Sequence, residues 1–327
     1  MALSQTLCDL DRVPPLLESI RLRCDESRWL AQAEQWSLNA TQALEQLAVH
    51  YEENDKSEDA YEEPKEFRCL KLLDKHLELL MGTENLQVLF IERLADLEMV
   101  ELLLCLQVDP STDDNQAIIC ASRNGHVAVV ERLLKDERVD PSANNNEAIR
   151  LASCFGHLAV VDRLLKDERV VPSADDNFAI RIASEKGHLA VVDRLLQDER
   201  VVPSALNNYA LNWASHNGHL AVVKRLLQDE RVDPSANNSY ALHWASLNDH
   251  VAVVERLLQD ERVDPSADNN YALHWASHKG HLAVVERLLA NERVNPSANN
   301  NAAIRLASEG GHKAVVELLK AHGCVLP

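Results

Sequence analysis

A proline recurs every 31 residues along the C-terminal two thirds of the chain, and this period limits the fold more than any other feature of the sequence. It falls at Pro110, Pro141, Pro172, Pro203, Pro234, Pro265, Pro296 and Pro327. The text between the prolines also repeats: the units that begin at Pro234 and Pro265 differ at only 9 of 31 positions. A unit of this length cannot bury its own apolar face and must pack that face against the neighbouring unit. The period therefore predicts seven stacked units over residues 110–327.

Each unit is predicted to be a helix, a turn, a second helix and a loop. In the unit that starts at Pro265, small and medium side chains recur at helical spacing around Ala272 and Ala276, which allows neighbouring helices to approach closely. Gly280 ends this helix, because glycine adopts the left-handed conformation; Asp249 replaces it in the fifth unit. In the second helix we expect the following side chains to point inward: Leu282, Val284, Val285, Leu288 and Leu289. Glu286 and Arg287 are expected to face outward.

The junction between units carries two further signals. Asp264–Ala267 has Asp and Pro at the first two positions of a type I turn. An asparagine or serine stands shortly before each first helix, and we interpret this position as part of an N-cap. Its members are Asn115, Asn146, Asn177, Asn208, Ser239, Asn270 and Asn301.

This repeating text resembles the ankyrin repeat. Ala272–Ser277, Gly280-His281 and Val284–Leu289 correspond to the family's TPLHLAA, GH and VVxLLL segments, and the match recurs seven times. The resemblance implies an all-α solenoid of helix-turn-helix units that binds other proteins on its concave face. The unit is shorter than the family's roughly 33 residues, so we expect the projecting hairpin to be shortened or reduced to a loop. Arrays this uniform are similar to those of large DNA viruses, protists and bacterial effectors.

The chain before the array is expected to form a small helical region, residues 1–81. Arg28–Tyr51 and Phe67–Met81 show helical spacing, and the acidic loop 52–66 separates them. Residues 82–109 are interpreted as a degenerate capping repeat, because an end unit must face water on one side. In that repeat Asn85–Phe90 aligns with the first helix and Leu97–Leu104 with the second.

Net charge narrows the classes of partner. The chain holds 33 basic and 52 acidic residues, a formal charge of −19, which repels phosphate backbones and anionic membranes. No apolar run is long enough to cross a bilayer, and no signal peptide is recognisable at the start. We therefore expect no nucleic acid or membrane partner and a monomer in the cytoplasm, which is the host's cytoplasm if the source is a virus or a secreting bacterium.

Seven cysteines occur without any C-x-x-C pair. Their odd number excludes a full set of intrachain disulfides, and we expect a reducing compartment.

Half of the fourteen histidines occupy one repeat position, from His126 to His312. Neighbouring helices lie about 10 Å apart, too far for these imidazoles to share a metal, so no metal site is expected along the row. The family resemblance assigns this histidine to the turn. His216, His243, His274 and His278 cluster in units four to six, where we expect surface positions or hydrogen bonds within the first helix. No catalytic motif occurs, and we expect no enzyme activity and no cofactor.

Positions that vary between units are the best candidates for binding, because packing holds the others fixed. Tyrosines open the first helix of units four to six, each followed four residues later by a tryptophan. They would form an aromatic strip suited to a partner protein, unless the tryptophans and tyrosines fill core positions. Two more variable positions precede the terminating glycine. The predicted partner-binding residues are Phe155, Lys186, Tyr209, His216, Asn217, Tyr240, Leu247, Asn248, Tyr271, His278 and Lys279.

Two function classes are compatible with these observations. The first is a non-enzymatic interaction module that binds a protein on the concave face. The second is a substrate adaptor whose N-terminal helical region recruits a larger assembly. The stretch from Pro14 to Trp36 loosely resembles an F-box, which implies a ubiquitin ligase, although its spacing is about four residues short.

Overall fold

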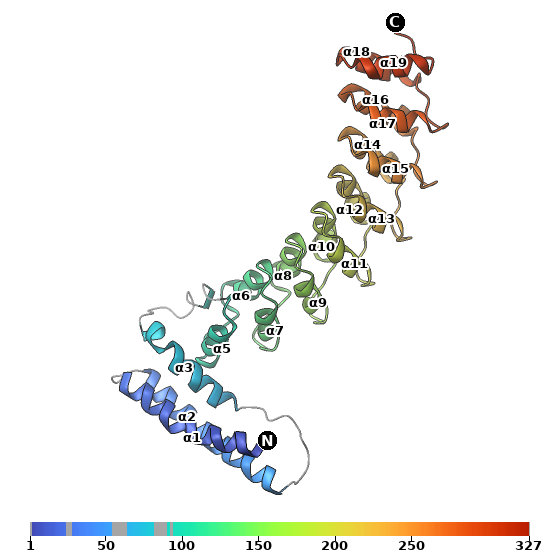
Figure 1. The fold of residues 1–327 in the computed structure, drawn as a ribbon. Coiled ribbons are helices and arrows are strands. Elements are labelled where there is room, and N and C mark those ends of the chain that lie inside the picture. Colours follow the sequence, from blue (N-terminus) through green and yellow to red (C-terminus); the bar gives the residue numbers. More distant parts are fainter. Residues whose placement is uncertain (1, 24–27, 54–63, 82–89, 92–93, 327) are drawn as a thin grey trace. The chain divides into compact units, whose positions relative to one another are not determined.

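The computed structural model describes residues 2–23, 28–53, 64–81, 90–91 and 94–326, and this part of the chain consists of helices and connecting turns without a strand (Figure 1). It forms two compact units. The first contains Met1–Ala121 and Ala128–Val139, and the second contains Ser122–Val127 and Asp140–Pro327. None of the described helices has the length and the apolar character that a membrane span requires.

The first unit begins with three long helices that pack against one another: α1 (Ala2–Arg23), α2 (Arg28–Glu53) and α3 (Lys65–Met81). Their core contains the fully buried side chains of Ile20, Leu44 and Phe67. A shorter helix, α5 (Leu97–Cys105), packs on α3. It includes Leu97–Leu104, the segment that was aligned with the second helix of the capping repeat. Residues 54–63 of the expected acidic loop 52–66 lie outside the described residues. So do residues 85–89 of the segment Asn85–Phe90, which was aligned with the first helix of the capping repeat.

One pair of cysteines is bonded, which the sequence did not predict. Cys69 of α3 and Cys105 of α5 form a disulfide across 36 residues of sequence. The odd number of cysteines excluded only a complete pairing, and it left this bond open. Among the described residues, the cysteines that form no disulfide are Cys120, Cys154 and Cys324.

Helix pairs follow one another from residue 112 to the end of the chain (Figure 1). The first helices are α6 (Thr112–Arg123), α8 (Ala143–Cys154), α10 (Ala174–Glu185), α12 (Ala205–His216), α14 (Ala236–Leu247), α16 (Ala267–Lys279) and α18 (Ala298–Glu309). The second helices are α7 (Val127–Leu134), α9 (Leu158–Leu164), α11 (Leu189–Leu196), α13 (Leu220–Leu227), α15 (Val251–Leu258), α17 (Leu282–Leu289) and α19 (Lys313–Ala321). We number the repeats one to seven from the proline at which each begins. From repeat two onward, first helices pack on first helices and second on second, so each kind forms a row.

Apolar burial follows the predicted faces with one difference. In α17, Val284, Val285 and Leu288 are buried, whereas Leu282 and Leu289 are only half-buried. Two of the five side chains expected to point inward therefore lie at the edges of the buried face.

The start of each first helix differs from the prediction. Three consecutive residues adopt left-handed backbone angles; in repeat six these are Asp268, Asn269 and Asn270, with φ of 49°, 56° and 66°. Asparagine and aspartate tolerate this conformation better than other side chains do. The asparagine row therefore does not cap the helix, and its role is to build a left-handed turn before it.

The last residue of that turn hydrogen-bonds to the end of its own repeat. Asn270 Oδ1 accepts from the backbone N–H of Asn295, at 2.9 Å, directly before the proline of the next repeat. Asn146, Asn177 and Asn208 make the same bond in repeats two to four, and Ser239 makes it through its hydroxyl in repeat five. The left-handed turn thus fixes the junction between repeats.

The histidine row joins each repeat to the one before it. The Nε2–H of His312 donates to the backbone carbonyl of His278, at 2.9 Å, and five other repeats show the same bond. The terminating glycine makes room for this ring: at Gly280 a Cβ would come within 2.3 Å of His312 Nδ1. Asp249 takes the glycine's place in repeat five with a φ of 61°. Glycine is therefore selected here by its backbone angle and by the neighbouring ring.

The connection after each second helix is a loop held by an arginine, which agrees with the predicted reduction of the hairpin. In repeat five, Arg262 donates two hydrogen bonds to the carboxylate of Asp260, at 2.9 and 2.8 Å. It also donates to the carbonyl of Val232 in repeat four, at 3.0 Å. This bidentate hydrogen bonding holds the pKa of Asp260 below its ordinary value.

Candidate protein-binding surface

Aromatic rings form a continuous chain of contacts over the first helices of repeats four to six. His216 lies edge-on against tryptophans of two repeats, 4.9 Å from Trp213 and 4.8 Å from Trp244 between ring centres. His243 contacts Trp244 at 5.3 Å and Tyr271 of the next repeat at 4.4 Å. Such pairs stabilise beyond simple burial. We call this set the aromatic strip; it consists of Tyr209, Trp213, His216, Tyr240, His243, Trp244, Tyr271, Trp275 and His278.

The strip is neither fully buried nor fully exposed. Its three tryptophans, Tyr209 and Tyr240 are half-buried, and Tyr271 is 38% exposed. The Tyr209 hydroxyl lies 3.5 Å from Glu185 Oε2 of the preceding repeat, and desolvation and this carboxylate raise the pKa of Tyr209. These side chains therefore pack against one another and still present ring surface to solvent.

Two of the strip's histidines sit in different environments. His216 Nδ1 accepts a hydrogen bond from the Asn248 side chain, at 3.0 Å, and desolvation lowers its pKa. His243 is 7% exposed, its Nδ1 has no hydrogen-bond partner in the protein, and burial lowers its pKa to about 4. The expectation of surface positions or helix hydrogen bonds is therefore wrong for His243.

His274, which lies on α16 outside the strip, resembles His243. It is 5% exposed, and its Nε2 has no partner in the protein. Burial, followed by the charge of Arg305, lowers its pKa. For His274 too, the expected surface position is wrong.

The remaining predicted residues surround the strip or lie apart from it. Asn217 is exposed and donates to the carbonyl of Glu185, at 3.2 Å. Lys186 is exposed and pairs with Glu185 at 3.1 Å. Leu247 is half-buried and Lys279 is exposed. Phe155 is 46% exposed in repeat two, where it stacks with Arg123 and His157 and belongs to a separate aromatic contact.

The roles of the side chains that hold the left-handed turns were not predicted from the sequence. Arg181 donates to the carbonyls of Asp176 and Asp175, both at 2.9 Å. Arg150, Asn212 and Arg305 donate to the turn of their own repeat in the same way. These side chains occupy the same position of their repeats, and this position varies between Arg, Asn and His. That variation was the signal in the sequence from which their role could have been predicted.

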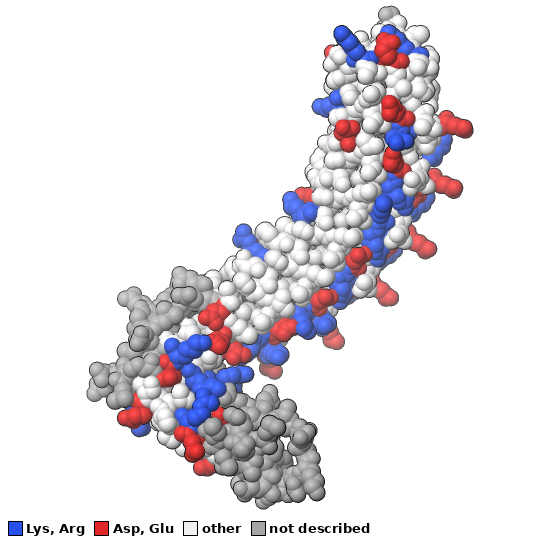
Figure 2. Space-filling model, in the orientation of Figure 1, with Lys and Arg blue, Asp and Glu red and all other residues white. Residues whose placement is uncertain are grey.

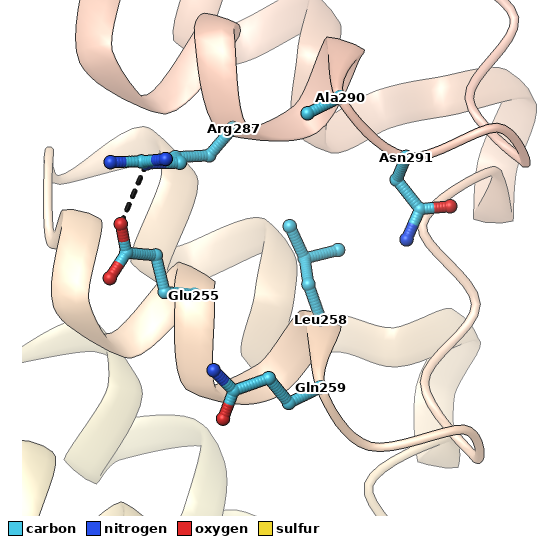
Figure 3. A pocket seen from close by; sticks show the side chains of 6 residues that line it. All are labelled: Glu255, Leu258, Gln259, Arg287, Ala290 and Asn291. Carbon is cyan, nitrogen blue, oxygen red and sulfur yellow. Dashed lines mark ion pairs between the residues drawn. The ribbon is translucent and has the colours of Figure 1, made fainter.

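The second helices present a different surface, on which acidic and basic side chains alternate (Figure 2). Inter-repeat ion pairs follow this row: Arg194 with Asp162, Arg225 with Asp193, and Arg287 with Glu255. Figure 3 shows the last pair, at 2.6 Å, over a shallow indentation between α15 and α17. Over the first helices of repeats four and five the face seen in Figure 2 is mostly uncharged.

Within the described residues no group of three or more His, Cys, Asp or Glu is arranged to hold a metal ion. The described first-helix surface offers aromatic and polar contacts.

A comparison with models of protein families agrees with this architecture. A family model described as Ankyrin repeats (3 copies) matches residues 89–176, 180–268 and 259–326, so the chain belongs to the ankyrin-repeat family. Ankyrin repeats bind other proteins, and the family typically consists of non-enzymatic interaction modules. The X-ray structure of an ankyrin repeat family protein from Legionella pneumophila is 20% identical, with a TM-score of 0.37 over 85% of this chain and 94% of that chain. A comparison with curated protein sequences found no match.

Proposed function

We propose that the chain is an interaction module that binds a partner protein through the aromatic strip of repeats four to six. The strip lies on the first helices, which carry the concave, ligand-facing side in the arrays that the sequence resembles. Neither catalysis nor a cofactor enters the proposal, and it assumes a monomer in the cytoplasm.

One observation carries this proposal: nine aromatic rings are linked across three repeats while Tyr271 still exposes 38% of its surface. Tyrosine and tryptophan dominate the energetics of protein interfaces, because they offer large and rigid contact area at low entropic cost. Burial inside the fold would account for the tryptophans alone. It would not account for tyrosine at the same position of three successive repeats, since Ala302 occupies that position in repeat seven.

The test is an affinity capture with the intact chain and a triple variant, Tyr209→Ala with Tyr240→Ala and Tyr271→Ala. Ala302 shows that the fold accepts alanine at this position. Arg287→Ala, which removes an ion pair from the second-helix row, is the matched control. We expect a protein that the intact chain and the control retain and the triple variant loses. Equal retention by the triple variant would refute the proposal.

A second candidate is an adaptor in which the N-terminal helices recruit a larger assembly. The observation that favours it is that α1, α2 and α3 pack on one another and bury their own core. Capture with the full chain should then recover a ubiquitin-ligase component. A variant with Leu38→Asp, a leucine that is 55% exposed on α2, would lose that component. Recovery of no such component would dismiss the adaptor and leave the interaction module untouched.

A further inference from the structure

A regular contact joins successive first helices: the residue that opens one helix covers a flat side chain on the helix before it. Phe178 covers the guanidinium of Arg150 at 5.3 Å, and Tyr209 covers that of Arg181 at 4.9 Å. Tyr271 covers the ring of His243 at 4.4 Å. In each case the aromatic ring comes from the following repeat.

The junction between repeats six and seven lacks this ring. His274 holds the place of His243, but Ala302 stands where a tyrosine or phenylalanine would cover it. Leu306 likewise replaces the tryptophan. The result is a cavity of about 370 Å³ between α16 and α18, lined by His274, Tyr271, Trp275, Arg305, Leu306 and Glu309 among others.

Two histidines next to this junction have ring nitrogens without a hydrogen-bond partner in the protein. Nε2 of His274, a residue that is 5% exposed and lines the cavity, is one. Nδ1 of His278 is the other, and its ring lies against Trp275 of the cavity wall. In repeat four the equivalent histidine, His216, is bonded by Asn248, whereas Gly310 stands at that position in repeat seven. His243 Nδ1 also lacks a partner although Tyr271 covers its ring, so what sets the junction of repeats six and seven apart is the missing ring over His274.

We propose that this cavity receives a tyrosine side chain of the partner protein. This inference rests on the proposed function. The partner's ring takes the place over His274 that Tyr271 takes over His243. Tyr209, whose hydroxyl approaches Glu185, shows where the phenol points, because His278 holds the place of Glu185 in repeat six. The hydroxyl of the incoming tyrosine therefore points toward His278.

Charge around the cavity disfavours an acidic side chain. Arg305 donates to the carbonyls of Asn300 and Asn299, at 3.2 and 3.4 Å, and so is engaged by its own turn. Asp268 and Glu309 line the same cavity, so its lining carries two carboxylates against one guanidinium. An aspartate or glutamate side chain would meet this negative charge, whereas a phenol meets rings and carboxylates that can accept a hydrogen bond.

The direct test uses N-acetyl-L-tyrosine amide as the probe, with N-acetyl-L-leucine amide as its matched control, on the full chain. Binding is followed through the NMR signal of the Trp275 indole N–H, assigned by Trp275→Phe. We expect a saturable shift with the tyrosine amide and binding of the leucine amide that is weaker by roughly threefold or more. Equal shifts with both compounds, or no shift with either, would overturn the proposal.

Ala302→Tyr fills the cavity from within and copies the residue of repeats four to six. We expect it to abolish the probe's shift and to raise the melting temperature. Ala302→Glu, which copies Glu147 of repeat two, is a second variant that blocks the cavity without a ring, and it should also abolish the shift. A shift that persists in a folded variant would contradict the proposal.

The two proposals fail separately. If the captured partner binds Ala302→Tyr and the intact chain equally well, while the tyrosine triple variant loses it, the cavity is not used and the strip still is. If the triple variant also binds the partner equally well, the proposed function itself fails.

Discussion

Asn270 Oδ1 accepts a hydrogen bond from the backbone N–H of Asn295 at 2.9 Å, and this bond closes repeat six at the point where repeat seven begins. The same bond recurs along the array, and in repeat five the hydroxyl oxygen of Ser239 is the acceptor. It explains why asparagine is kept at a backbone angle that most residues avoid. A repeated array depends on such junctions, because each repeat is stabilised mainly by its neighbours.

Asn270→Ala should destabilise the array by about 1–3 kcal/mol, since it leaves the Asn295 N–H without its acceptor and puts alanine at a φ of 66°. Urea denaturation followed by circular dichroism measures the change. Asn270→Ser should recover most of the loss, because Ser239 makes the bond in repeat five. If serine and alanine cost the same, the bond is not what stabilises the junction.

Asp249→Gly should stabilise the protein by about 0.5–1 kcal/mol. Asp249 adopts a φ of 61°, which glycine adopts without steric cost. The substitution removes only the contact between Asp249 Oδ1 and His281 Nδ1, at 3.7 Å. That contact contributes little, because the Asp249 side chain is exposed to solvent. The change in the urea midpoint checks this expectation.

The reverse change at another terminator serves as its control. Gly280→Asp should destabilise, because a Cβ there approaches His312 Nδ1 within 2.3 Å and a side chain must adopt a φ of 78°. The stability changes of Asp249→Gly and Gly280→Asp need not be equal in size. If Gly280→Asp stabilised the protein, this account of the glycine that ends the first helix would be contradicted.

Arg262→Lys should cost about 1 kcal/mol, since lysine does not reproduce the two-point contact with Asp260 and the bond to Val232. It should also return the pKa of Asp260 toward its ordinary value, which a carboxyl NMR titration measures. Arg293→Lys is the matched control, because Asn291 replaces the aspartate there and should make the loss smaller. Equal losses would argue against the carboxylate pair.

Acid should destabilise repeats five and six before carboxylates protonate. Burial lowers the pKa of His243 from 6.5 to about 4, so between these values the unfolded chain binds more protons than the folded one. Stability is therefore fully present above about pH 6.5 and falls as the pH drops toward 4. The negative charge of Asp268 raises the pKa of His243, but this effect is smaller than that of burial.

Melting temperatures of the intact chain and of His243→Asn, compared between pH 7.5 and pH 5, test this. Asn212 occupies this position in repeat four and donates to the Asn207 carbonyl at 3.0 Å, so asparagine fits. We expect the variant to lose less stability over this range. Parallel pH curves for the two proteins would show that His243 is not the titrating group.

Much of this architecture follows from the 31-residue period alone. Apolar spacing predicted both helices of each repeat, and Gly280 marked the end of the first, because these features act locally. The left-handed turn was missed, since asparagine favours helix caps and left-handed angles alike, and only the three-residue run Asp268–Asn270 distinguishes them. The bond from Cys69 to Cys105 joins two helices, and no local spacing predicts it.

The candidate surface could be placed by sequence only in part. Tyr209, Tyr240 and Tyr271 stood out because they vary where the scaffold does not. What their rings touch depends on the neighbouring repeat. The cavity beside His274 results from the missing rings at Ala302 and Leu306, which is a property of two repeats together.

The most direct measurement is the dissociation constant of the purified partner for the intact chain, the tyrosine triple variant and Arg287→Ala, with folding of each verified by circular dichroism. Hot-spot tyrosines contribute about 2 kcal/mol or more, so we predict binding by the triple variant that is weaker by roughly thirtyfold or more, and an unchanged constant for Arg287→Ala. A folded triple variant that binds as tightly as the intact chain would contradict the assignment of the aromatic strip as the binding surface.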